Sequence, residues 1–329
     1  MEGNITNDNP IGNNFKNMTE LPSICITRKK KLNFTSKITI AIPVYERTEF
    51  FYEAINSAIN QTVKCKIIVI DNASSHNYFS DYITSLGNPN IKYYRNNINI
   101  GMVLNWNKCI ELSETEYITI LHDDDALHPN FIEIANKEIE NGREYFAAGA
   151  YIQENIPEIF NQNIKKISRY YRFRECKFHF GTLSPFPGII FPVKAAKNIG
   201  YFNANAYPPA DYDFWIRLTR ICLCFRTNTK LAFYRIGPQR ETNNCYMNMT
   251  IKVWELQKRI SLFKQLRLLS EYHLYTMFMN YNPTKTDWEE LKTSSPELFF
   301  AMQKQSHYEN NFMIKNAIKI ASKLITHIL

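Results

Sequence analysis

Glycine is scarce in this chain, and its scarcity excludes several phosphate-binding sites. The 329 residues include ten glycines, and no two of them lie closer than seven positions apart. A dinucleotide-binding loop, a Walker A loop and the nucleophile elbow of the α/β hydrolases need glycines about two to five positions apart. If the protein binds a phosphorylated ligand, a metal ion or basic side chains must therefore supply the countercharge.

The cysteines, histidines and apolar runs exclude further classes of protein. The seven cysteines form no C-x-x-C, and no two of the seven histidines have the short spacing of a zinc site. Scattered cysteines in an odd number favour reduced thiols over a disulfide framework. No apolar run approaches ~18 residues, and the polar start of the chain does not resemble a secretory signal. We therefore expect a cytoplasmic protein without a membrane span.

The composition is that of a folded protein with a net positive charge. Hydrophobic residues make up 45% of the chain, which is enough for a sizeable core, and the formal net charge is +8. Residues 1–35 are polar and rich in asparagine, and they contain a basic run at 28–31. We expect a flexible arm there, either solvated or in contact with an anionic membrane or nucleic acid.

Strand-like and helix-like segments alternate from Ile38 onward. Apolar runs of strand length are predicted at 38–42, 66–71, 91–95 and 117–121, with Pro43 ending the first. Amphipathic helices are predicted at 49–61, at 101–112, and from Pro129 to about 141. This alternation predicts an α/β fold with a mostly parallel sheet covered on both faces by helices.

Polar side chains follow three of these strands, where ligands of parallel sheets bind. Tyr45 and Arg47 follow the first strand, Asp71 ends the second, and the triplet Asp123–Asp125 follows the fourth. Three adjacent carboxylates repel one another, and a divalent cation relieves that repulsion. A capping role ahead of the helix at Pro129 is the alternative explanation for the triplet.

Five segments in this order resemble glycosyltransferase family 2, whose members have the GT-A fold. They are ITIAIPVYER from Ile38, IIVIDNAS from Ile67, Asn99-Ile100-Gly101, YITILHDDDALHP from Tyr117, and ADYDFWIRL from Ala210. The resemblance covers about residues 36–240 and implies a catalytic domain there. The region 241–329 is predicted to be a helical extension.

The resemblance implies roles for the matching residues. The nucleotide sugar would be bound by Pro43, Tyr45, Arg47, Asp71, Asn99, Gly101, Asp123 and Asp124. A divalent metal, Mn²⁺ or Mg²⁺, would be bound by Asp124 and Asp125. Asp211 would be the catalytic base, although a carboxylate at the start of a helix is also what a capping residue would be.

Two departures from the family pattern affect the predicted site. Ala210 replaces the glutamate that usually precedes the base, and Gly237 replaces a histidine that can help to bind the metal or diphosphate. Arg240 either compensates for that histidine or is an ordinary solvated charge. Phe186 and Tyr207 are candidates for stacking on the acceptor.

The resemblance implies an inverting, metal-dependent transfer of a hexosyl or N-acetylhexosaminyl group, with a UDP-sugar as donor. The acceptor would be a hydroxyl of a glycan or lipid-linked oligosaccharide in bacterial surface polysaccharide synthesis, for example of lipopolysaccharide, and no nucleic acid would be involved. The alternatives are a sugar-phosphate nucleotidyltransferase and a non-catalytic relative that binds nucleotide sugars.

The last 18 residues have an amphipathic pattern. In 312–329 isoleucines and alanines recur at helical spacing, and Lys315, Lys319 and Lys323 repeat every four residues. This pattern is typical of a helix that lies on an anionic membrane. A helix that packs on the rest of the protein is the alternative. In the first case the enzyme would be peripheral on the inner face of the cytoplasmic membrane.

Overall fold

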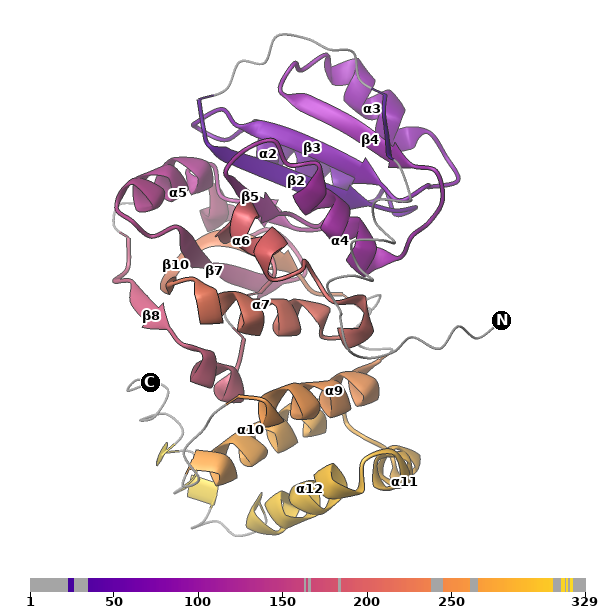
Figure 1. The fold of residues 1–329 in the computed structure, drawn as a ribbon, viewed down its shortest axis with the longest axis vertical. Helices are drawn as coiled ribbons and strands as arrows, with labels where there is room; N and C mark the ends of the chain where they lie inside the picture. Colours follow the sequence, from indigo (N-terminus) through magenta and orange to yellow (C-terminus); the bar gives the residue numbers. More distant parts are fainter. Residues whose placement is uncertain are drawn as a thin grey trace. The chain divides into compact units, whose positions relative to one another are not determined.

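The computed structural model forms two compact units, and each is described separately (Figure 1). The sheet unit comprises Met1–Arg172, Ser184–Asn205 and Arg217–Ile236, and the helical unit comprises Phe173–Leu183, Ala206–Ile216 and Gly237–Leu329. The residues described are 23–26, 35–162, 164, 167–182, 185–237, 245–260, 266–309, 315, 316, 318, 320 and 321. The basic run at 28–31 and Arg240 lie outside them.

A ten-stranded sheet organises the sheet unit. Its order is β1-β4-β3-β2-β5-β9-β7-β10-β6, and β8 pairs with β10. The strands are β1 (Ser23–Cys25), β2 (Ile38–Val44), β3 (Lys66–Asp71), β4 (Ile91–Asn96), β5 (Tyr117–Ile120), β6 (Ala126–Leu127), β7 (Tyr145–Gln153), β8 (Tyr171–Phe173), β9 (Ile189–Pro192) and β10 (Cys224–Arg235).

Four neighbouring strands, β4-β3-β2-β5, run parallel, as their near-continuous apolar sequences predict. Val44 is in register with Asp71, and Asp71 with Arg95, so the loops after β2, β3 and β4 leave the same edge of the sheet. The prediction that Pro43 ends the first strand is wrong. Pro43 pairs with Ile70 inside β2, and the strand continues to Val44.

The strand β9 joins this parallel half to the remainder of the sheet. It is antiparallel to β5 on one side and to β7 on the other, whereas β7 and β10 are parallel to each other. The chain crosses the same junction a second time, because β5 ends at Ile120 and β6, which pairs with β10, begins at Ala126. The intervening residues contain the acidic triplet.

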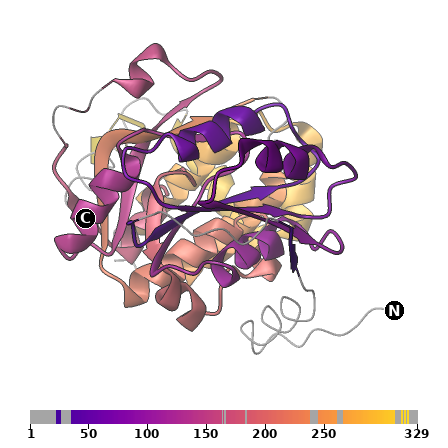
Figure 2. The same ribbon diagram turned by 90° about the horizontal axis from the view of Figure 1, so that it is seen from above.

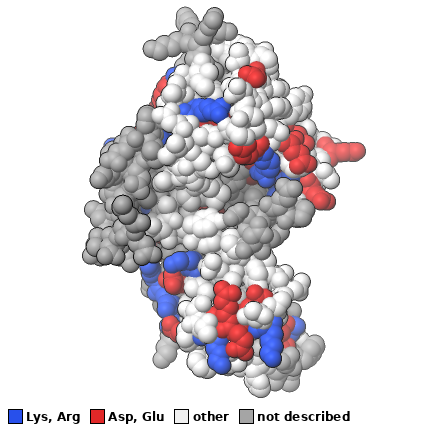
Figure 3. All heavy atoms as spheres, turned by 90° about the vertical axis from the view of Figure 1, so that its right-hand side faces the viewer, with Lys and Arg blue, Asp and Glu red and all other residues white. Residues whose placement is uncertain are grey.

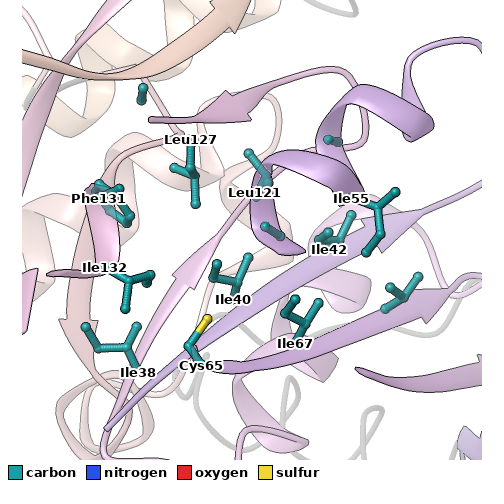
Figure 4. Close-up of a cluster of buried hydrophobic side chains, with 14 of the residues drawn as sticks. Ile38, Ile40, Ile42, Ile55, Cys65, Ile67, Leu121, Leu127, Phe131 and Ile132 are labelled. Carbon is teal, nitrogen blue, oxygen red and sulfur yellow. The ribbon is translucent and has the colours of Figure 1, made fainter. Parts of the chain in front are cut away.

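Helices cover both faces of the parallel strands (Figure 2). On one face, side chains from α2 and α5 join alternate residues of β2 and β3 in the core cluster of Figure 4, which includes Ile40, Ile55, Ile67 and Phe131. The opposite face contacts α4. The helices of this unit are α2 (Phe51–Ile59), α3 (Tyr78–Leu86), α4 (Met102–Glu111), α5 (Phe131–Glu140) and α6 (Val193–Asn198), with short 3-10 turns at Glu158–Asn161 and Ala204–Ala206.

The helical unit is built from α9 (Tyr246–Lys258), α10 (Arg267–Met279), α11 (Lys285–Ser294) and α12 (Pro296–Glu309). It includes a 3-10 turn, η2 (Glu175–Phe180), and the first part of α7 (Ala210–Ile221). Buried polar contacts tie these segments together. The Tyr212 hydroxyl donates a hydrogen bond to the Phe178 carbonyl, and His179 Nδ1 lies 2.8 Å from Ser270 Oγ.

The compact units divide the chain differently from the predicted boundary at residue 240, because Phe173–Leu183 and Ala206–Ile216 belong to the helical unit. In the lower part of Figure 3, acidic and basic side chains are interspersed on the face of the C-terminal helices. Lys258 and Glu297, 2.7 Å apart, form one of the ion pairs of this unit. Among the described residues, no helix is long and apolar enough to cross a membrane.

Candidate functional site

Two loops at the carboxyl edge of the parallel strands are fastened to each other by Glu46. Glu46 adopts a positive φ of 54°, and its carboxylate accepts hydrogen bonds from the Ser75 amide at 2.7 Å and the Ser75 hydroxyl at 2.9 Å. Its own amide donates to Ser74 Oγ, and its carbonyl lies 2.8 Å from His76 Nε2. The hydrogen bonds from Ser75 lower the pKa of Glu46. Glu46 was not among the predicted site residues, although it lies between the predicted Tyr45 and Arg47.

The Asp71 carboxylate is fully buried, and protein donors already bind both of its oxygens. Oδ1 accepts hydrogen bonds from the amide and hydroxyl of Ser74, and Oδ2 accepts one from the Tyr93 hydroxyl at 2.6 Å. Arg95 Nη1 lies 3.8 Å from Oδ2. Asp71 therefore orders the loop after β3 through Ser74, and Glu46 binds the same loop through Ser74 and Ser75. A direct contact between Asp71 and a base stays a prediction.

Asn99 and Gly101 belong to an asparagine network behind these loops. Asn72 donates to Asn99 Oδ1 at 2.7 Å, and the Gly101 amide donates to the same oxygen at 2.8 Å. Gly101 has a φ of +83° and precedes α4 directly, so a residue with a Cβ would be strained there. Asn99 and Gly101 therefore lie in the loop after β4, next to the loops after β2 and β3. Tyr45 is 43% exposed and available to a ligand.

Arg47 lies against the acidic triplet. Its Nη2 atom forms an ion pair with Asp123 and lies 2.9 Å from Asp124 Oδ2. Burial raises the pKa of Asp123 to about 6, and Arg47 opposes that rise. The structure therefore brings together the predicted residues of the first loop and of the triplet.

Asp125 differs from the other two carboxylates because it is almost completely buried. Its Oδ1 accepts a hydrogen bond from the Arg235 amide at 2.9 Å, and its Oδ2 has no hydrogen-bond partner among the described residues. Burial and the nearby Asp124 raise the pKa of Asp125 well above its ordinary value. A buried carboxylate oxygen without a partner is costly, and a cation would remove that cost.

The histidine that precedes the triplet joins the same group. Ligand atoms of His122, Asp124 and Asp125 lie within 4.8 Å of one another. Burial lowers the pKa of His122 to about 4, so its imidazole is neutral near pH 7, which is the form that binds metals. The free oxygen of Asp125, a second carboxylate and a neutral imidazole fit a divalent metal. His122 was not among the predicted metal ligands, and its place next to the triplet was the available signal.

Arg235, at the end of β10, holds the triplet loop in place. Its side chain donates to the Asp124 carbonyl at 2.9 Å, to the Glu154 carbonyl at 2.5 Å and to Glu53 Oε2 at 2.6 Å. The guanidinium also lies 4.0 Å from the centroid of the Phe50 ring. Arg235 lies two positions before Gly237, where the family pattern is interrupted, and it was not among the predicted site residues.

Asp211 lies in the first turn of α7, in the part assigned to the helical unit. It is partly exposed, and its Oδ1 accepts a hydrogen bond from the Tyr212 amide at 2.8 Å. Loss of solvation raises the pKa of Asp211 to about 6. A carboxylate with this pKa is ionised at neutral pH and still basic enough to accept a proton.

Phe186 is packed among aromatic rings of the protein, contrary to a role in stacking on the acceptor. It is 7% exposed, and its ring centroid lies 4.4 Å from that of His122 and 4.8 Å from that of Trp106. Tyr207 is 37% exposed, so its predicted role stays open.

The sequence pattern of the family described as "Glycosyl transferase family 2" matches residues 39–198. This segment holds all the residues predicted to bind the nucleotide sugar or the metal, whereas Asp211 lies beyond it. The match covers just under half of the chain, so residues 39–198 are similar to glycosyltransferase family 2, and the structure has a GT-A-like fold.

Individual relatives show the same similarity, and the chain spans only part of the length of those that it matches. An uncharacterized glycosyltransferase of Rickettsia conorii is 32% identical over 59% of this chain, which corresponds to 33% of that relative's own length. The Escherichia coli protein WcaA, named as a candidate colanic acid biosynthesis glycosyl transferase, is 31% identical over 38% of this chain and 46% of its own. Crystallised S. aureus TarS 1–349 in complex with UDP-GlcNAc has a TM-score of 0.57 at 14% identity and covers 82% of this chain and 80% of its own.

Proposed function

We propose that this protein is an inverting glycosyltransferase that transfers a hexosyl or N-acetylhexosaminyl group from a UDP-sugar to a hydroxyl group of a glycan or lipid-linked acceptor. The observation that carries the proposal is the group of three carboxylates at the end of β5, held against Arg47. Structural neighbours crystallised with UDP and with UDP-GlcNAc support the choice of donor.

Residues of the loops after β2 and β3, which Glu46 joins, would bind the nucleotide. The exposed ring of Tyr45 is suited to stack on the base, and Pro43 sets the course of the chain before it. Asp71 supports this site by fixing the loop that carries Ser74. Asn99 and Gly101 shape the adjacent loop, and Asp123 would accept a hydrogen bond from a ribose hydroxyl.

The leaving diphosphate needs positive charge. Arg47 is part of that charge, because its guanidinium already lies between the first loop and the triplet. When bound at Asp124 and Asp125, Mn²⁺ or Mg²⁺ supplies Lewis-acid stabilisation of the leaving group. Asp211 is the proposed general base that accepts the proton of the acceptor hydroxyl. Its pKa of about 6 suits that role.

The acceptor is proposed only as a class of molecule, a glycan or a lipid-linked oligosaccharide. The colanic acid association of the E. coli relative supports a role in bacterial surface polysaccharide synthesis. We place that reaction in the cytoplasm, near the inner face of the membrane.

Donor screening tests the proposed function. The purified protein is incubated with UDP-, GDP- and dTDP-sugars in Mn²⁺ or Mg²⁺, and the released nucleotide is identified. We expect free UDP from a UDP-sugar, a higher melting temperature with that donor, and loss of turnover in excess chelator. In a parallel reaction with UTP and a sugar 1-phosphate, release of pyrophosphate would indicate nucleotidyl transfer. Full activity of the UDP-sugar reaction in chelator would contradict the metal site.

A further inference from the structure

We propose that His122 is a ligand of the divalent cation together with Asp124 and Asp125, and that its imidazole makes the site prefer Mn²⁺ to Mg²⁺. The inference rests on the proposed function in one respect, since the cation is the one that would serve the nucleotide sugar. It adds a nitrogen ligand from this chain to a site that carboxylates alone were expected to form.

The distances within the group suit a shared cation. His122 Nδ1 lies 3.7 Å from Asp125 Oδ2, which is too far for a hydrogen bond. Two ligands with bonds of about 2.1 Å to one cation lie about 3.0 Å apart at right angles and about 4.2 Å apart when opposite. The pair therefore falls within the range for ligands of one ion. The ligand atoms of all three residues lie within 4.8 Å of one another, so a small movement of Asp124 toward the other two would bring all three into contact with one cation.

The second observation is the unsatisfied oxygen of Asp125. The residue is 1% exposed, its Oδ1 is held by the Arg235 amide, and its Oδ2 is buried without a partner among the described residues. Because Oδ1 is fixed, Oδ2 has a defined direction, toward the His122 ring. An unsatisfied buried oxygen that faces an imidazole nitrogen indicates a missing cation between them.

Aromatic rings hold the imidazole in position. The His122 ring is stacked on Trp106 at an interplanar angle of 22° and a centroid distance of 5.5 Å, and it lies 4.4 Å from the Phe186 ring. No hydrogen bond to the His122 imidazole is found in the described part of the chain, and its Nε2 is buried without one. The packing therefore sets the ring plane and leaves Nδ1 available for a metal.

Ligand chemistry then predicts the metal preference. Mg²⁺ is bound almost entirely by oxygen ligands, whereas imidazole nitrogen suits transition metals. Replacing one oxygen by the His122 nitrogen should weaken the competition from Mg²⁺ and retain Mn²⁺.

Pulsed electron paramagnetic resonance of Mn²⁺ tests the inference without an activity assay. Mn²⁺ and UDP are added to the full-length protein, prepared once with natural histidine and once with ¹⁵N-histidine. We expect a nitrogen coupling to Mn²⁺ that changes from the ¹⁴N to the ¹⁵N pattern with the label. Mn²⁺ that binds without any change on labelling would overturn the inference and leave the proposed glycosyltransferase function intact.

Two variants identify the histidine. His122→Phe keeps the aromatic packing and removes the nitrogen, so the coupling should disappear and the affinity for Mn²⁺ relative to Mg²⁺ should fall by on the order of tenfold. His307→Phe, at an exposed position of α12, should retain the coupling. A coupling that persists in His122→Phe would overturn the assignment. Sugar transfer at full rate in chelator would instead refute the metal in the proposed function.

Discussion

At the scale of single residues, the three carboxylates of the triplet have different surroundings. Asp123 and Asp124 face Arg47, and Asp125 is buried against the backbone of β10. Crowded carboxylates of this kind differ in basicity, so substitutions at the three positions should have unequal effects.

Removing Arg47 should destabilise the metal-free protein, and more so at high pH. Since the pKa of Asp123 is already raised to about 6 and Arg47 opposes the rise, Arg47→Ala should raise it further. A carboxyl whose pKa is raised by folding costs stability as pH rises through that pKa. We expect the melting temperature of Arg47→Ala to fall by about 2–4 °C at pH 8 and by less at pH 5.

Mn²⁺ provides the check on this explanation, because it should restore part of the lost stability at pH 8. Lys137→Ala is the control, since it removes an exposed i,i+4 pair with Glu133 and should have little effect at either pH. A pH-independent loss in Arg47→Ala would indicate lost packing instead.

Substitution of Asp211 should separate catalysis from structure. Asp211→Asn retains the size of the side chain and can accept the hydrogen bond from Tyr212, but it does not accept a proton at neutral pH. We expect turnover to fall by ~10²-fold or more, with donor binding near that of the wild type. The wild-type rate with saturating metal should fall as pH decreases through about 6, because protonated Asp211 is inactive.

Asp213→Asn is the matched control on the same helix. Asp213 is buried, so its substitution can affect stability, but its turnover per folded molecule should stay within about tenfold of the wild type. Equal losses of turnover at both positions would show that the base lies elsewhere.

The three carboxylates of the triplet could be predicted from the sequence, but most of the residues that order the site could not. Three adjacent aspartates after an apolar run are visible in one sequence window. Glu46 and Arg235 act through residues 28 and more than 100 positions away, and those pairings arise only when the sheet forms. The predicted base contact of Asp71 depended on its position in a motif, which gives no information on Ser74 and Tyr93 as competing donors.

At the scale of elements, Arg235 makes the position of the triplet loop depend on β10. Arg235→Lys retains the charge and loses the planar fork that reaches Asp124, Glu154 and Glu53 together. We expect the free energy of unfolding in urea to fall by about 2–4 kcal/mol, because two buried carbonyls lose their donor. The affinity for Mn²⁺ should fall as well.

Arg143→Lys serves as the comparison for this prediction. Arg143 pairs with Glu138 and contacts the Tyr170 ring, but it touches no part of the triplet loop. The free energy of unfolding should fall less in Arg143→Lys than in Arg235→Lys, and the affinity for Mn²⁺ should stay unchanged. If both variants lose Mn²⁺ affinity equally, the anchoring role of Arg235 is wrong.

Most elements of the parallel half were predictable from periodicity, with ends within one or two residues. The strand at Lys66–Asp71 has the predicted bounds, and the predicted helix at 101–112 is α4, Met102–Glu111. Pro43 was misjudged because a proline within a strand usually marks an end. β7 and β10 were not predicted as a pair, since 70 residues of less regular sequence separate them.

At the scale of the whole molecule, the C-terminal stretch has two competing explanations. Of 312–329 the structure describes residues 315, 316, 318, 320 and 321, and the rest lies outside the described residues. Ile318 is buried in a cluster with Leu269 and Tyr272 of α10, which favours packing on the helical unit at that position. Ile320 is 62% exposed.

Deleting residues 312–329 tests both explanations. If the stretch holds the protein on an anionic membrane, the truncated protein should stay folded and cease to sediment with phosphatidylglycerol vesicles. Because Ile318 is buried, we expect the melting temperature of the truncated protein to fall as well. Ile320→Glu is the sharper variant, since it should reduce vesicle binding and leave the melting temperature unchanged.

The short strand β9 has a consequence for how the protein unfolds. Its four residues pair with β5 on one side and with β7 on the other, so they join the sheet half that contains β2 to β5 to the half that contains β7 and β10. The triplet segment crosses the same junction, and the ion pair of Arg235 with Glu53 of α2 bridges it as well. Local opening along this seam could separate the halves before either one melts. A cation on the triplet, whose loop Arg235 anchors to β10, would act as a clamp across the seam. In hydrogen exchange, Mn²⁺ with UDP should therefore slow the amides of Ile190 and Phe191, while equal protection with and without these ligands would show that the seam opens independently of the site.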